Sequence, residues 1–190
     1  MSYLIAGIAV FAGVHLFSML LPDQRNSLKA RMGEGPYKGI YSLVSLAGLA
    51  VMIWGFWSLS SDPSGSSVVY EPAQWARHVT MLLVLFGFIS LSGFHGKGYL
   101  KHWLRNPFSI GIVLWSVGHL LSNGMLHDIL LFGTFLVLAV LDIVLSTARG
   151  KRPGHEPQIR SDMTAVVSGI ILYAVFLFGV HPYIFNVPII

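Results

Sequence analysis

The residues of this sequence that could do chemistry are histidines and a few carboxylates, because the chain contains no cysteine. That absence excludes structural disulfides, cysteine-ligated zinc, iron–sulfur clusters and thiol nucleophiles. The histidines show no HExxH or comparable metal-ligand spacing, and no GxSxG, GxGxxG or P-loop pattern occurs. No two carboxylates are placed to share acid and base roles. Hydrolase and nucleotide chemistry are therefore not expected.

Two histidines, His15 and His119, stand inside long uncharged runs, where an ionisable group is costly and is a first candidate for function. A neutral imidazole among aromatic and small residues can ligate haem iron. The same surroundings suit helix packing with an interhelical hydrogen bond, and a proton or ion path is the third interpretation. On a helix, the i±3 and i±4 rule supplies such neighbours: Phe11, Ala12, Ser18 and Met19 beside His15, and Trp115 and Ser122 beside His119.

Asp142 is another ionisable residue at predicted membrane depth, near the cytoplasmic end of its apolar run. The simplest interpretation is a salt bridge to Arg149 or another loop cation. The alternative is a proton relay, or an anchor for a histidine Nδ1–H. The predicted depths of His15 and His119 differ by about 12 Å, at ~1.5 Å per helical residue. Ligation of one iron by both is therefore strained, and helix tilt alters the difference.

Composition indicates which elements must position these residues. Hydrophobic residues make up 54% of the 190 residues and charged residues 11%, against roughly 45–50% and about 25% in ordinary soluble domains. A soluble globule is thus excluded, and the absence of strand alternation argues against a barrel. A bilayer core needs about 20 apolar residues of helix, and six runs meet this need: residues 1–22, 39–61, 78–96, 106–127, 126–147 and 163–190.

We therefore predict an all-α fold: an integral membrane bundle of six transmembrane helices that forms a single domain over residues 1–190. Asn106 and Pro107 offer an N-cap and a first helical proline to the fourth span, and Ser161 or Asp162 can cap the sixth.

Lysine and arginine set the orientation, since short basic loops remain cytoplasmic. Eleven of the twelve lie in the loops after the first, third and fifth spans, and only Arg77 lies on the other side. This distribution predicts that both termini are periplasmic. The net charge of +4 follows from this topology, so the expected partner is the lipid bilayer and no nucleic acid.

Several stretches of the chain resemble motifs of the NnrU family of bacterial multi-pass membrane proteins, and the resemblance runs over nearly the whole length. The stretches are Gly13-Val14-His15-Leu16, the run from Tyr37 to Gly48, Trp75-Ala76-Arg77-His78, the run from Leu114 to Gly124, Leu130-Leu131-Phe132-Gly133 and Ala139-Val140-Leu141-Asp142. The resemblance implies a multi-pass protein of the bacterial inner membrane with a single NnrU-type transmembrane domain, in the context of nitrite and nitric oxide reduction during denitrification.

The family is also similar to the plant and cyanobacterial zeta-carotene isomerase, a membrane enzyme that uses haem b. By this resemblance the haem iron ligands fall on His15 and His119, between the first and fourth spans. We count Trp115, Asn123, Asp142 and His78 as supporting residues. A hydrophobic polyene or a redox partner is the interaction that the resemblance implies.

The chain departs from the pattern of these relatives at three positions, which limits what can be carried over. Ser116 stands where the plant isomerase has a cysteine that can replace a ligand, and Asn106 stands where the family often has histidine. Met125 stands where an acidic residue is usual after Asn-Gly. The leading hypothesis is thus a haem b protein with a redox, sensing or cis-trans isomerase role. The alternatives are a non-haem accessory or assembly protein of a nitrite or nitric oxide reductase system, and a small transporter or proton path.

Overall fold

The computed structural model describes residues 1–184, and within them it contains helices and no β-strand. The last six residues of the predicted sixth span, 185–190, lie outside the described residues. The chain divides into two compact units. Unit 1 contains Met1–Glu71 and Gly124–Thr134, and unit 2 contains Pro72–Asn123 and the chain from Phe135 onward.

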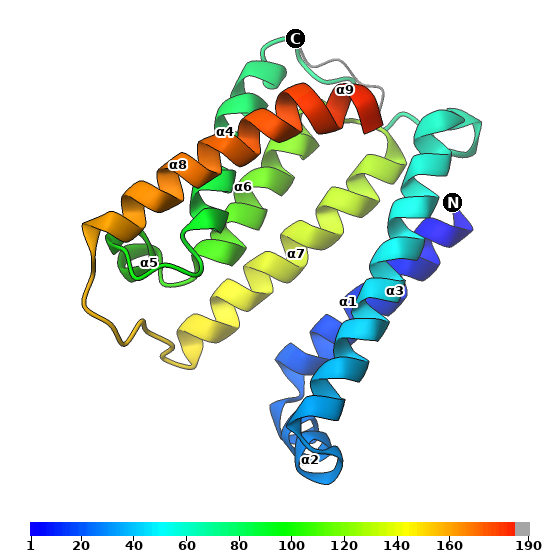
Figure 1. Cartoon of the computed structure of the whole chain (residues 1–190). Helices are drawn as coiled ribbons and strands as arrows, with labels where there is room; N and C mark the ends of the chain where they lie inside the picture. The colour runs from blue at the N-terminus through cyan, green and yellow to red at the C-terminus, as the bar shows by residue number, and fades with distance from the viewer. Residues whose placement is uncertain (185–190) are drawn as a thin grey trace. The chain divides into compact units, whose positions relative to one another are not determined.

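Unit 1 is built on two long helices that pack along each other, α1 (Ser2–Leu20) and α3 (Glu34–Ser61) (Figure 1). Glycines allow the close approach: a Cβ at Gly55 would overlap the backbone of Leu4, and one at Gly7 would overlap Met52. Leu4 and Met52 are fully buried. Small residues at a helix interface that let backbones meet are typical of packing within a membrane, where the hydrophobic effect does not drive helices together.

A short helix and an outer loop complete unit 1. Helix α2 (Pro22–Met32) connects α1 to α3, and the 3-10 turn η1 (Pro63–Gly65) follows α3. The loop after η1 is held to the start of α7 (Leu126–Ala148) by backbone hydrogen bonds from Val69 N to Gly124 O, 2.9 Å, and from Leu126 N to Ser67 O, 2.8 Å. These backbone hydrogen bonds therefore hold the loop after η1 against the start of α7.

Unit 2 is organised around α4 (Ala76–Ser92), which packs against α6 (Pro107–Ser122) and α8 (Ile159–Val175) (Figure 1). Hydroxyls join α4 to α6: Thr80 Oγ1 donates to Gly118 O, 2.6 Å, and Ser90 Oγ donates to Pro107 O, 2.7 Å. The unit also contains α5 (Tyr99–Leu104), the larger part of α7, a π-helical turn η2 (Phe176–Val180) and α9 (His181–Ile184).

Within residues 1–184, four helical segments are long and apolar enough to cross a membrane: α1, α3, α7 and Ile159–Tyr183. Helices α4 and α6 coincide with the third and fourth predicted spans but are shorter, at 17 and 16 residues. Large apolar side chains face outward, for example Leu43 at 68% exposed and Trp54 at 67%. This pattern, with small residues inside and large apolar residues outside, fits helices that contact lipid.

The polar segments hold two features that differ from the sequence-based expectation. Residues after the first span form a helix, α2, rather than an open loop. Asp162 does not cap its own helix; its carboxylate accepts hydrogen bonds from the backbone N–H groups of Tyr99 and Leu100, at 2.8 and 2.9 Å. It therefore caps α5, because the fold brings the start of α8 beside the first turn of that helix.

Candidate functional site

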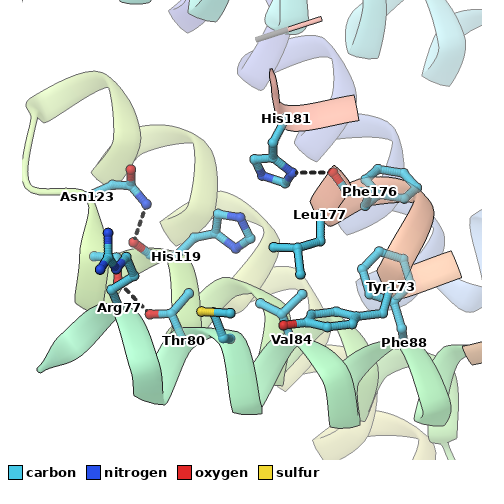
Figure 2. Close-up of a pocket in the computed structure, with 12 residues that line it drawn as sticks. Arg77, Thr80, Val84, Phe88, His119, Asn123, Tyr173, Phe176, Leu177 and His181 are labelled. Atoms are coloured by element: carbon cyan, nitrogen blue, oxygen red, sulfur yellow. Dashed lines mark hydrogen bonds between the residues drawn. The ribbon is translucent and has the colours of Figure 1, made fainter. Parts of the chain in front are cut away.

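Unit 2 contains a cavity of about 220 Å³ at the end of α4 and α6, closed on another side by α8, η2 and α9 (Figure 2). One part of its lining is polar and contains Arg77, Thr80, His119, Ser122, Asn123 and His181. The other part is largely apolar and contains Met81, Val84, Phe88, Tyr173, Phe176 and Leu177. None of these described lining residues is acidic, so the cavity combines hydrogen-bonding and cationic groups at one end with an aromatic and aliphatic body.

His119 has its ring oriented by its own helix. Its Nδ1 lies 2.8 Å from Trp115 O, and because a carbonyl can only accept, Nδ1 carries the proton. The lone pair is therefore on Nε2, the nitrogen that can accept a proton or bind a metal. The Trp115 ring lies 4.9 Å from the His119 ring. Asn123 Nδ2 donates to His119 O at 2.8 Å and closes the C-terminal turn of α6.

His181 shares this cavity, which sequence reasoning did not anticipate. Its ring centroid lies 6.3 Å from that of His119, with an interplanar angle of 19°. Its Nδ1 donates to Phe176 O at 2.9 Å, five residues back rather than four. The π-helical turn accounts for this spacing, since it adds a residue to the helical turn before His181. Such an irregular turn leaves no mark in hydrophobic periodicity.

Arg77 stands at the exposed edge of the cavity, and none of the ion pairs between described residues includes it. Thr80 and Ser122, beside it in the lining, are 2.6 Å apart through their hydroxyl oxygens. The hydroxyls therefore join α4 to α6, whereas the guanidinium is the permanent charge of the site.

His15 lies in unit 1 and is oriented in the same manner as His119. Its Nδ1 donates to Phe11 O at 2.7 Å, which places the lone pair on Nε2. Aromatic rings flank it: the Phe11 ring at 4.2 Å and the Tyr41 ring at 5.7 Å between centroids. His15 and His119 thus belong to different units, and their pairing as ligands of one iron stays a prediction.

Of the four supporting residues that the sequence suggested, two contact His119 and the other two, Asp142 and His78, are not among the residues that line the cavity. Trp115 and Asn123 contact His119, as described above. Asp142 accepts hydrogen bonds from Asn106 Nδ2 at 2.5 Å and Ser109 Oγ at 2.6 Å, so two neutral donors satisfy its carboxylate. His78 is exposed on α4 and is not among the residues that line the cavity.

A second polar cluster, in unit 1, was missed because its members follow a turn in the sequence. His127 and Asp128 are 4% and 7% exposed, although they stand in the first turn of α7. His127 Nδ1 lies 2.9 Å from Ser66 Oγ, and its Nε2 lies 3.6 Å from an Asp128 oxygen. The tethered outer loop covers them, which only the fold could reveal.

Metal binding by side chains alone is not indicated: within residues 1–184 no group of three or more His, Asp or Glu could hold an ion. Haem iron has a smaller requirement, because the porphyrin supplies four ligands and the protein supplies one or two axial groups. The donor chemistry of His15 and His119, with Nδ1–H bound to a carbonyl and the lone pair on Nε2, fits that requirement.

Comparison with known proteins assigns the chain to a family but finds no individual protein that matches it. No curated protein and no solved structure matches the chain. The family model described as NnrU protein matches residues 3–189, nearly the full length, and it includes both units of the fold and all residues of the cavity. The chain belongs to the NnrU family.

Proposed function

We propose that this NnrU protein spans the bacterial inner membrane six times, with both termini in the periplasm. The six helices that supply the spans are α1, α3, α4, α6, α7 and the segment from Ile159. Eleven of twelve basic residues follow the odd-numbered spans, as the positive-inside rule requires for cytoplasmic loops. Helices α4 and α6 are short for a bilayer of about 30 Å, and interfacial residues at their ends complete the crossing.

In this proposal the protein binds haem b through His15 and His119. The observation that carries this proposal is the shared orientation of the two rings, each donating Nδ1–H to the carbonyl four residues earlier. That bond sets the tautomer, raises the basicity of Nε2 and limits ring rotation, as for histidines that ligate metals. The rings of Phe11 and Tyr41 lie beside the His15 imidazole, and the ring of Trp115 lies beside that of His119, so each histidine has aromatic neighbours.

The bound haem would supply electron transfer, gas binding or activation of a double bond, and the residues of the chain would supply position and an apolar environment. The cavity beside His119, about 220 Å³, is below the range of roughly 300–1,000 Å³ for pockets of drug-sized ligands. A porphyrin on His119 would therefore extend beyond this cavity. A redox, sensing or cis-trans isomerase role in nitrogen-oxide metabolism follows from the family context, with a redox partner or a hydrophobic polyene as the second reactant.

The test is the visible spectrum of the protein purified in mild detergent, oxidised and then reduced with dithionite. A Soret band with sharp reduced α and β bands is expected for low-spin haem b. His15→Ala and His119→Ala should each remove most of the haem, measured as pyridine haemochrome per protein. His102→Ala, an exposed histidine on α5, is the matched control and should retain it. Unchanged spectra in both variants would exclude these ligands.

A non-haem accessory or assembly role is the second candidate, and one observation favours it. The bond from Nδ1 to a carbonyl in the same helix also satisfies a histidine whose only role is structural. A colourless, monodisperse protein whose deletion lowers nitrite or nitric oxide reductase activity would support this role and would contradict haem binding.

A further inference from the structure

The cavity of unit 2 is lined by the guanidinium of Arg77, which is in none of the ion pairs between residues 1–184. Among the described residues that line the cavity, Arg77 is the only Lys or Arg, and none is acidic. Two carboxylates of unit 2 have partners elsewhere: Asp142 accepts hydrogen bonds from Asn106 and Ser109, and Asp162 caps α5. A guanidinium is charged at every relevant pH and offers five donors in a planar fork that matches a carboxylate. The cavity is therefore complementary to an anion at its Arg77 end.

The rest of the lining is suited to an apolar body. Arg77, Thr80, Val84 and Phe88 follow one another along one face of α4, a stretch of roughly 16 Å at ~1.5 Å per residue. Leu177 and Tyr173 face this stretch from the C-terminal segment, and Figure 2 shows the Tyr173 ring lying across the cavity beside Val84. At about 220 Å³, the space admits a narrow chain rather than a broad ring system.

We propose that this cavity binds an apolar molecule that carries a carboxylate, with Arg77 as its counter-ion and the Val84, Phe88 and Leu177 side chains around its chain. Charge complementarity at one end and apolar lining along α4 carry the assignment. A membrane offers this chemistry as a free fatty acid. Haem offers the same carboxylate as a propionate, whose porphyrin ring would lie outside this cavity. The proposal does not require haem, since the residues it uses are Arg77 and the apolar lining rather than an iron ligand.

Equilibrium binding of radiolabelled dodecanoate to the protein in lipid nanodiscs tests the assignment, with empty nanodiscs as the background. The wild-type protein should bind about one dodecanoate per chain, and unlabelled dodecanol should compete at least tenfold more weakly than unlabelled dodecanoate. Arg77→Gln should weaken dodecanoate binding about tenfold, because a charge-assisted hydrogen bond is lost. Arg77→Lys should restore part of it.

Two further variants separate loss of binding from loss of fold. Arg105→Gln changes another arginine of unit 2, which is not in the lining, and should bind as the wild type does. Val84→Trp should block the cavity and abolish binding while circular dichroism shows retained helix. Equal affinity for the acid and the alcohol, or equal binding by the Arg77→Gln and Arg105→Gln proteins, would overturn the proposal.

Haemin added as a competitor distinguishes the two sources of the carboxylate. Displacement of dodecanoate by haemin from the wild-type protein, lost in Arg77→Gln, would identify the propionate as an occupant. Saturable dodecanoate binding that haemin does not affect would identify the fatty acid. Both results support the assignment. All of these measurements can be made on protein purified without haem. If the proposed haem binding fails, the dodecanoate test of this cavity is therefore still valid.

Discussion

At the residue scale, several polar groups within the apolar helices have hydrogen-bond partners on a neighbouring helix. Asp142 is the clearest case, because its carboxylate takes hydrogen bonds from Asn106 and Ser109. Ser109 is 3% exposed, so it has no water to replace a lost partner. A buried donor that loses its acceptor costs about 1–3 kcal/mol.

Asp142→Ala is therefore expected to lower the free energy of unfolding by about 1–3 kcal/mol, since it leaves Ser109 and Asn106 without their acceptor. The measurement is SDS-induced unfolding in mixed micelles, followed by circular dichroism. Ser168→Ala is the control, because that hydroxyl bonds only to carbonyls of its own helix and should change stability by less than about 0.5 kcal/mol. Equal stability of the two variants would contradict this role for Asp142.

At the scale of elements, glycine packing decides how closely helices approach. In α3, Gly55 faces the backbone of Leu4 at a distance that a Cβ would not allow, whereas a Cβ at Gly39 would meet nothing within 4 Å. Helix α3 thus contains one glycine, Gly55, where a side chain would clash with α1, and another, Gly39, where a side chain would have free space. The comparison isolates packing from helix propensity.

Gly55→Leu should separate α1 from α3 and destabilise unit 1 by at least about 1–3 kcal/mol, the usual cost of overpacking. Gly39→Leu, the same substitution at the open position, should be neutral or stabilising by up to about 1 kcal/mol, because leucine is a better helix former than glycine. Thermal unfolding in detergent measures both. A Gly55→Leu protein as stable as the wild type would refute the close contact.

Helix α5 gives a second prediction at this scale, since a side chain from α8 caps it. Asp162→Ala removes both acceptors of the Tyr99 and Leu100 amides and should cost about 0.5–2 kcal/mol locally, the range for a lost N-cap. Hydrogen exchange at residues 99–104 should accelerate by about tenfold relative to the wild type. Asp23→Ala, in the first turn of α2, should leave this segment unchanged. Unaltered exchange in Asp162→Ala would rule out the cap.

At the scale of the whole molecule, the absence of cysteine makes the topology directly testable. Single cysteines at exposed positions report the side of the membrane: Ser64→Cys after α3, Ser27→Cys in α2 and Gly154→Cys before α8. In intact spheroplasts, an impermeant maleimide should label Ser64→Cys and leave the other two unlabelled. All three should react after the membrane is opened. Labelling of Ser27→Cys in intact spheroplasts would contradict the proposed orientation, because it would place α2 on the periplasmic side.

Much of the architecture could be predicted from composition, because a span requires only a long run of mostly apolar residues. The runs at 1–22, 39–61 and 126–147 became α1, α3 and α7, with ends displaced by a few residues. The candidate site was predicted less completely. His15 and His119 were found because an imidazole inside an apolar run is costly. His181 was not connected to His119, since 61 residues separate them and a π-helical turn sets the final ring position.

The amino-acid sequence by itself determined the membrane class, the helical elements, the family and the two histidines within apolar helices, because each depends on residue type and local spacing. The tertiary structure decided which polar groups meet: His119 with His181, Asp142 with Asn106 and Ser109, and Asp162 with α5. It also decided that Arg77 lines a cavity to which residues 1–184 contribute no acidic side chain. These pairings are long-range, and they arise from which helix faces pack together, a property that no local pattern in the chain encodes.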